Sequence, residues 1–142
     1  MKEQKILEKE IERGDFGSGG EVSSKLKDLL RKLGVRSDIA RKLTIITYEL
    51  EMNIIIHSEG GEIRAIVTPE FLKVIAEDRG PGISDIEKAF QPGYSTASDE
   101  VREMGFGAGM GLNNVEHYSD DVEVVSESGE GTRISAVVYL KD

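Results

Sequence analysis

The sequence predicts an α+β fold arranged as a two-layer sandwich, and two patterns support this. Residues 21–33 and 37–57 have the apolar spacing of helices. Four shorter segments have the pattern of strands and occur as two consecutive pairs around turn residues, 62–68 with 71–78 and 122–127 with 133–140. Antiparallel hairpins combined with about three main helices give a layered α+β architecture.

Length and composition limit the class of protein. The 142 residues suit a single domain spanning 1–142, and the absence of cysteine excludes disulfides, thiol catalysis and cysteine-based zinc sites. No apolar run is long enough to cross a membrane and no secretory signal follows Met1, so we expect a cytoplasmic protein. The formal net charge of −9 argues against broad contact with nucleic acid or an anionic membrane.

The first third of the chain contains one ambiguous segment and two helices. Residues 6–16 favour a helix by propensity, with an edge strand as the alternative. After a glycine-rich loop at 14–20, residues 21–33 form an amphipathic helix that Gly34 ends. Ser37 or Asp38 can cap the next helix, which continues to about residue 57.

The remainder of the chain alternates hairpins with a less regular middle. Residues 62–68 and 71–78 form a predicted hairpin, and a capping box at 84–87 starts a short helix toward Phe90. Residues 91–105 lack periodicity and are expected to form a mobile loop. The chain then continues with a predicted helix and two strands, 109–118, 122–127 and 133–140.

Three polar residues interrupt the long helix at intervals of four: Glu49, Asn53 and His57. At about 3.6 residues per turn, each step of four drifts by only about 40°, so these side chains form one stripe along one face. Burying such groups is costly without partners, so either the protein satisfies them internally or this face lines a ligand site. Glu51 lies off the stripe, and we expect it to be solvated.

Two glycine-rich segments favour the ligand site. Glu-Asp-Arg-Gly-Pro-Gly at 77–82 follows a predicted strand, and Gly-Phe-Gly-Ala-Gly-Met-Gly at 105–111 opens a predicted helix. Glycine permits a close approach of the backbone to a ligand, and N–H groups at the start of a helix bind phosphate. Near the carboxyl terminus, Gly-Glu-Gly-Thr at 129–132 completes an ordered set of motifs.

This ordered set resembles that of the GHKL ATPase superfamily, which includes gyrase, a heat-shock chaperone and histidine kinases. The resemblance covers nearly the whole chain, and it is strongest to the small bacterial anti-sigma regulatory factors, which are serine/threonine protein kinases. It implies a mixed, mainly antiparallel sheet with the helices on one face, and an edge strand at residues 6–16. The chain has no room for the dimerisation helices of a histidine kinase or the transducer domain of gyrase.

The resemblance also implies roles for individual residues. Asn53 falls on the N-box and would bind Mg²⁺, and Glu49, one turn earlier, would act as the catalytic base. Asp78 would accept the exocyclic amine of adenine, with Thr132 in support. Backbone N–H groups of the two glycine boxes would contact ATP at Gly80, Gly82, Gly107, Gly109 and Gly111. Residues 91–104 would form a lid over the phosphates.

Each assignment has a structural alternative. Asn53 could bond to the backbone in the core, Glu49 could form a surface ion pair, and Asp78 could cap a turn. The glycines could form a plain turn at the start of a helix. His57 could line the mouth of the site, although a role in ending the helix is the simpler explanation.

The predicted function is that of an ATP- and Mg²⁺-dependent serine/threonine protein kinase. Its implied substrate is a small STAS-domain protein, an anti-sigma factor antagonist, in a partner-switching pathway. The alternative is a nucleotide-gated binding module that sequesters a sigma factor or activates a phosphatase without significant phosphoryl transfer. Glu49 favours the kinase, because a carboxylate beside phosphate is unfavourable for binding alone. The sequence does not determine whether the protein forms a homodimer.

Overall fold

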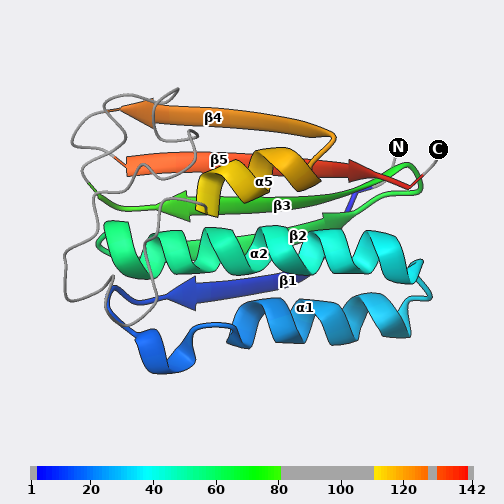
Figure 1. Ribbon diagram of the computed structural model, residues 1–142, viewed down its shortest axis with the longest axis horizontal. Helices are drawn as coiled ribbons and strands as arrows, with labels where there is room; N and C mark the ends of the chain where they lie inside the picture. Colours follow the sequence, from blue (N-terminus) through cyan, green and yellow to red (C-terminus); the bar gives the residue numbers. More distant parts are fainter. Residues whose placement is uncertain (1–2, 81–110, 128–130, 141–142) are drawn as a thin grey trace.

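One antiparallel sheet and three α-helices make up the described part of the computed structural model, which comprises residues 3–80, 111–127 and 131–140 (Figure 1). In chain order the elements are β1 (Gln4–Ile11), the short 3-10 helix η1 (Phe16–Ser18), α1 (Glu21–Lys32), α2 (Ser37–His57), β2 (Gly61–Val67), β3 (Phe71–Asp78), α5 (Gly111–Tyr118), β4 (Asp121–Glu127) and β5 (Gly131–Tyr139).

The five described strands pair in the order β1-β2-β3-β5-β4, so β5 lies between β3 and β4. Each of these four pairings is antiparallel, which satisfies the expectation of a mainly antiparallel sheet. No parallel pair occurs among the described strands. The pairing of β2 with β3 joins Gly61 to Asp78, and the pairing of β4 with β5 joins Ser126 to Thr132. The register therefore brings the predicted adenine-binding residues to one end of the sheet.

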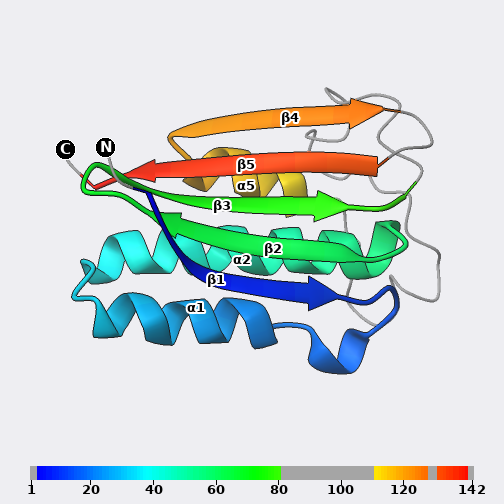
Figure 2. The ribbon, with the colours of Figure 1, turned by 180° about the vertical axis from the view of Figure 1, so that it is seen from behind.

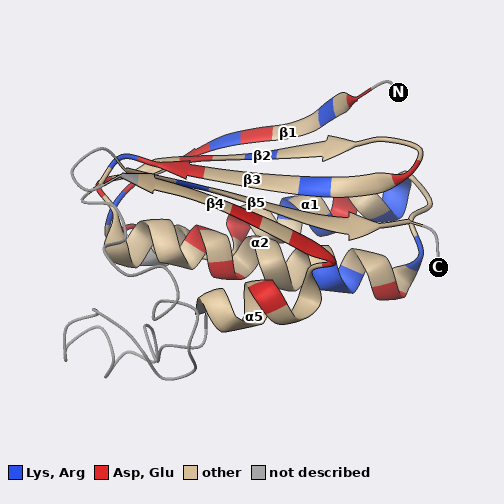
Figure 3. Cartoon of the chain, turned by 90° about the horizontal axis from the view of Figure 1, so that it is seen from above, with Lys and Arg blue, Asp and Glu red and all other residues tan. Residues whose placement is uncertain are grey.

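The three α-helices cover one face of the sheet, as predicted (Figures 2 and 3). α2 crosses the middle of this face, α1 lies beside it over β1, and α5 lies on its other side against β4 and β5. None of the helices in the described ranges combines the length and apolar character needed to cross a membrane.

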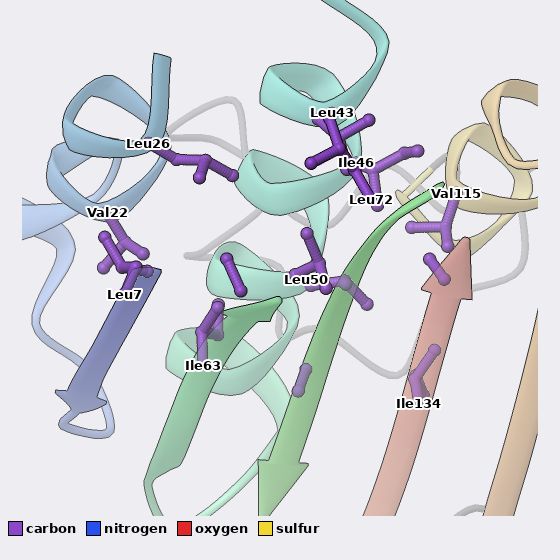
Figure 4. Close-up of a cluster of buried hydrophobic side chains, with 14 of the residues drawn as sticks. Leu7, Val22, Leu26, Leu43, Ile46, Leu50, Ile63, Leu72, Val115 and Ile134 are labelled. Atoms are coloured by element: carbon purple, nitrogen blue, oxygen red, sulfur yellow. The ribbon is translucent and has the colours of Figure 1, made fainter. Parts of the chain in front are cut away.

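The core fills the space between the sheet and the helices. Leu50 and Ile46 of α2 are fully buried against the sheet, where Ile63 and Leu72 face them from β2 and β3 (Figure 4). On β5, Ile134, Ala136 and Val138 are buried and form its inward face. Full burial of a side chain of this size contributes about 1.5–3 kcal/mol, so these residues fix how α2 sits on the sheet.

The ambiguous amino-terminal segment is a strand, but its bounds differ from the predicted 6–16. β1 spans Gln4–Ile11 and pairs with β2 along its length, with a shift of register between Lys5 and Leu7. Leu7 and Ile11 are buried beneath the helices. Pairing and burial therefore outweigh the helical propensity of the Lys- and Glu-rich sequence. The short helix expected from residue 84 and the loop at 91–105 lie outside the described residues.

The expectation that Glu51 is solvated is wrong. Its side chain is only 2% exposed, and its carboxylate accepts hydrogen bonds from the N–H groups of Val22 at 3.3 Å and Ser23 at 3.4 Å. These N–H groups lie in the first turn of α1 and have no partner within the helix. The N-cap residue, Gly20, provides no side-chain hydrogen bond. A carboxylate from α2 therefore caps α1, where the helix dipole also favours negative charge.

Replacing Glu51 with alanine removes this cap and leaves two buried N–H groups without their acceptor. We expect Glu51→Ala to lower the free energy of unfolding by about 1–3 kcal/mol. Urea denaturation followed by circular dichroism measures this loss. The exposed Glu116 of α5 is the matched control, and its substitution by alanine should change stability by less than about 0.5 kcal/mol. Equal effects of the two substitutions would contradict the capping role.

Candidate functional site

The predicted site residues that the structure describes gather at one end of the molecule. α2 and β3 end there, and α5 and β5 begin there, on the left in Figure 1. Four segments distant in the sequence thereby contribute polar groups to the same region. The residues concerned are Glu49 and Asn53 on α2, Asp78 and Gly80 at the end of β3, Gly111 at the start of α5, and Thr132 on β5.

The polar stripe of α2 is present as predicted. Glu49, Asn53 and His57 are each half-buried, whereas Leu50 and Ile54 of the same helix are fully buried. α5 packs against α2, and its Asn114 side chain is hydrogen-bonded to Glu49. The stripe therefore faces the α5 side of α2, away from the α1 side where Glu51 is bound.

Burial changes the acid–base properties of this stripe. It raises the pKa of Glu49 above the ordinary value of 4.5, and the hydrogen bond from Asn114 opposes this shift in part. A carboxylate with a raised pKa is a better proton acceptor near neutral pH than an ordinary one. Burial lowers the pKa of His57, so its imidazole is neutral at pH 7 and adds no positive charge to the site. His57 is also the last residue of α2.

A network of short hydrogen bonds ties the end of α2 to the end of β3. The Ser58 hydroxyl donates to the Ile54 carbonyl at 2.8 Å, and the Glu59 N–H donates to the Arg79 carbonyl at 2.7 Å. In return, the Arg79 N–H donates to the Gly60 carbonyl at 2.8 Å. These bonds hold the helix that carries Asn53 in a fixed position relative to the strand that carries Asp78.

Gly80 explains one glycine of the first predicted box. A Cβ on Gly80 would lie 3.2 Å from Cα of Ser58, which is a tight contact with the backbone. A small residue is therefore needed here to let the chain pass the end of α2, whatever its role toward a ligand. The structural and ligand-binding explanations of this glycine are compatible.

Asp78 and Thr132 meet as predicted. Oδ1 of Asp78 accepts a hydrogen bond from the Thr132 N–H at 3.0 Å. Burial raises the pKa of Asp78, and this hydrogen bond lowers it in part. Within the described residues the Thr132 N–H is the donor to this carboxylate, and it bonds to Oδ1. The Thr132 hydroxyl lies 2.9 Å from the Ser126 hydroxyl on β4.

Gly131 allows β5 to approach Asp78 this closely. Its φ of 109° lies in the left-handed region, and a Cβ there would come within 2.2 Å of the Asp78 carbonyl oxygen. No residue with a side chain fits this position without displacement of the backbone. Glycine at position 131 is therefore required by the close approach of β5 to Asp78.

Three predicted glycines, Gly82, Gly107 and Gly109, lie outside the described residues, as does the predicted lid at 91–104. Gly111 is the first residue of α5, the position from which helix N–H groups can bind phosphate. The described ranges contain no group of three Asp, Glu or His side chains that could hold a metal ion. Asn53 offers a neutral side-chain oxygen, the kind of ligand that Mg²⁺ prefers.

Some residues of the site could not be assigned from sequence. Asn114 has no spacing signal, because its contact with Glu49 depends on how α5 packs against α2. Ser126 contacts Thr132 on the neighbouring strand, whereas Ser58 bonds to Ile54 and Gly60, which are close to it in the sequence. Of these three residues, only Ser126 is marked in the sequence, because a serine stands where the alternation of Val122 and Val124 on β4 predicts an apolar residue.

Comparisons with known proteins agree with this geometry. Residues 38–142 match the family described as histidine kinase-, DNA gyrase B- and HSP90-like ATPase. The serine/threonine-protein kinase RsbT of Bacillus subtilis (strain 168) is 34% identical over 119 residues, which cover 81% of this chain and 84% of that protein. An anti-sigma F factor of Thermoanaerobacter sp. (strain X514) is 37% identical over 97 residues, which cover 65% of this chain and 64% of the relative, slightly under two thirds of its length.

A solved structure shows the same fold. A chain in the crystal structure of the SiaB-SiaC complex from Pseudomonas aeruginosa aligns with a TM-score of 0.61 over 94% of this chain and 91% of that chain. Its sequence identity is 13%, so the similarity concerns the fold alone.

The close approach at Gly131 can be tested against a second glycine with positive φ. Gly14 has φ 74°, and no atom lies within 4 Å of the place that a Cβ would take, so Gly14→Ala should cost only the backbone term of about 1–2 kcal/mol. Gly131→Ala adds a steric clash and should cost roughly 2–5 kcal/mol in total. Urea denaturation measures both. Equal losses for the two variants would show that the approach to Asp78 is not tight.

Proposed function

The chain belongs to the histidine kinase-, DNA gyrase B- and HSP90-like ATPases, since residues 38–142 match that family, and from this premise we propose that it is an ATP- and Mg²⁺-dependent serine/threonine protein kinase. One observation carries the proposal. Glu49, half-buried with a raised pKa, lies one helical turn before Asn53 on the face of α2 that meets α5. In the proposed roles, a proton acceptor would lie beside a metal ligand. The similarity to the kinase RsbT supports the same function.

The adenine base would be recognised at the end of β3. The Asp78 carboxylate has one oxygen committed to the Thr132 N–H, and its other oxygen would accept the exocyclic amine of adenine. Thr132 would support this contact from the adjacent strand. The phosphates would lie against backbone N–H groups of the glycine boxes, namely Gly80, Gly82, Gly107, Gly109 and Gly111.

Phosphoryl transfer would depend on the two residues of α2. When bound, ATP supplies the phosphoryl group, and Mg²⁺ supplies positive charge that offsets the negative charge of the phosphates. The Asn53 side-chain oxygen would coordinate the metal, and its half-buried position limits its freedom to move. Glu49 would accept the proton of the attacking hydroxyl, with Asn114 orienting the carboxylate.

The protein substrate would be a serine or threonine of a STAS-domain anti-sigma factor antagonist. The family relatives named as a serine/threonine-protein kinase and as anti-sigma F factors support a role in such a pathway. We place this activity in a single cytoplasmic domain that acts as a monomer or homodimer. The second candidate is a binding module that holds a sigma factor without phosphoryl transfer, and the anti-sigma F factors among the relatives favour it.

The adenine assignment is tested with Asp78→Asn. Asparagine can present an N–H group toward the exocyclic amine, so we expect ATP binding to weaken by about 1–3 kcal/mol in isothermal titration calorimetry. GTP should bind the wild-type protein more weakly than ATP does. Equal affinity for the two nucleotides, or no loss in the variant, would remove the assignment.

The stability of the same variant separates misfolding from lost binding. Burial raises the pKa of Asp78, so its ionised form is disfavoured in the folded state relative to the unfolded state. This penalty is absent below the unfolded pKa and develops as the pH rises through the folded pKa. The nucleotide-free Asp78→Asn variant should therefore unfold at neutral pH at a temperature no lower than wild type.

The catalytic assignment is tested with Glu49→Gln, which keeps the size of the side chain and removes its basicity. Turnover should fall by roughly 10²–10⁴-fold, while ATP affinity stays within a few-fold. A radiolabelled ATP assay on the partner captured from the source cell measures this. Glu116→Gln on the exposed face of α5 serves as the control and should retain full activity.

The pH profile gives an independent readout of Glu49. The base must be ionised, and its pKa is raised, so wild-type activity should fall as the pH decreases through a value above the ordinary 4.5. This acidic limb should be absent from the residual activity of Glu49→Gln. Phosphoserine or phosphothreonine missing from every wild-type reaction would favour the binding module. Full activity in Glu49→Gln would keep the kinase and remove the role of Glu49.

A further inference from the structure

The face of the sheet opposite the helices is not covered by any described helix or strand. Figure 2 shows this open face, and Figure 3 shows the three α-helices on the other side of the sheet. Because side chains alternate along a strand, the residues between the buried ones point to the open face. Of the four large apolar side chains that the described residues expose, Val125 and Tyr139 lie here, each 50% exposed. Such exposure on a flat surface is typical of an interaction site.

At the end far from the predicted ATP site, the open face is largely apolar. Phe71 of β3 pairs with Tyr139 of β5, and two residues further along Lys73 pairs with Val137. On its other side Lys73 pairs with Ile66 of β2. One lysine therefore lies within a patch of aromatic and β-branched side chains.

At the end near the predicted ATP site, the open face is charged. Glu77 of β3 pairs with Arg133 of β5. Arg64 of β2 forms an ion pair with Glu77 at 3.2 Å, and Arg133 lies 3.9 Å from Glu123 of β4. The side chains of Glu77 and Arg133 are still 45% and 48% exposed, so both can contact a further charged group.

This surface is complementary to a second copy of itself. Consider two open faces packed together about a two-fold axis that runs between β3 and β5, parallel to both strands. β3 of each copy then lies over β5 of the other. The register sets Phe71 against Tyr139 of the second copy, and Glu77 against Arg133 of the second copy. Because a two-fold contact is isologous, each of these contacts forms twice.

The charges on the open face select this axis. With the axis between β3 and β5, β2 lies over β4, so Arg64 meets Glu123 of the second copy. An axis along β3 would set Lys73 and Glu77 each against its own equivalent, and an axis along β5 would do the same to Arg133. Of these three axes, the one between the strands avoids like-charge contacts across β2, β3, β5 and β4.

We propose that the open face is a homodimer interface, in which two copies of the sheet pack face to face about the axis between β3 and β5. Sheets packed in this way lie about 10 Å apart with their strands aligned to within about 30°. Asp78 and Thr132 share the helix-covered face with Ala76 and Ile134, so the dimer leaves them uncovered. The inference is therefore independent of the proposed activity.

The test exchanges the charges of the central contact. Sedimentation velocity over a range of concentrations gives the dissociation constant of the wild-type dimer. Arg133→Glu and Glu77→Arg should each raise this constant by about 10- to 100-fold, because each variant sets like charges together twice. An equimolar mixture of the two variants should recover the dimer, because one variant is acidic at both positions and the other is basic at both.

Two exposed helix residues give controls with the same changes of net charge. Arg41→Glu on α2 and Glu116→Arg on α5 lie in the other layer and should leave the dissociation constant nearly unchanged. Tyr139→Ser tests the apolar end and should raise the constant by about 5- to 100-fold, because it removes an aromatic contact that forms twice. Tyr139 is half exposed, so this substitution spares the core.

The remaining outcomes would overturn the proposal. A wild-type protein that stays monomeric at every concentration would exclude the interface, and a dimer that none of the three variants weakens would have its contact elsewhere. Weakened dimers that the mixture does not restore would exclude the two-fold arrangement. Circular dichroism shows whether each variant is folded. If a charge variant is not, a mixture of Arg64→Glu with Glu123→Arg repeats the test at the second contact.

Discussion

The packing of α2 on the sheet is the constraint on which the site depends. Ile46, Leu50 and Ile54 must be buried against the strands, and a helix cannot turn about its axis without exposing them. This fixed rotation directs Glu51 to the start of α1 on one side, while Glu49 and Asn53 meet α5 on the other. The apolar residues of one helix thereby determine the directions of its polar ones.

The carboxyl groups of Glu49, Glu51 and Asp78 are used differently because their surroundings differ. Glu51 is fully buried and used by two backbone N–H groups, so it serves the fold. Burial raises the pKa of all three carboxyl groups, but Glu49 and Asp78 are only half-buried. Partial exposure is what the proposed roles of Glu49 and Asp78 toward a ligand require.

Sequence patterns predicted those features that are local to one element. Periodicity located α1, α2 and the β2–β3 hairpin, and the family resemblance implied that Asp78 at the end of β3 and Thr132 at the start of β5 act together. These sequence patterns could not predict contacts between elements. The burial of Glu51 depends on α1 lying beside α2, and the hydrogen bond of Asn114 depends on α5. Propensity alone favoured a helix for β1, and only the family resemblance implied the strand that pairs with β2.

The two outer strands of the sheet affect solubility. In the described part of the chain, β1 and β4 have a neighbouring strand on one side only, so their outer backbone groups could recruit a strand from another molecule. Both strands carry exposed charges, including Lys5 and Glu8 on β1 and Asp121 and Glu123 on β4. A foreign strand that docked there would have to desolvate these charges, which protects the protein from edge-to-edge aggregation.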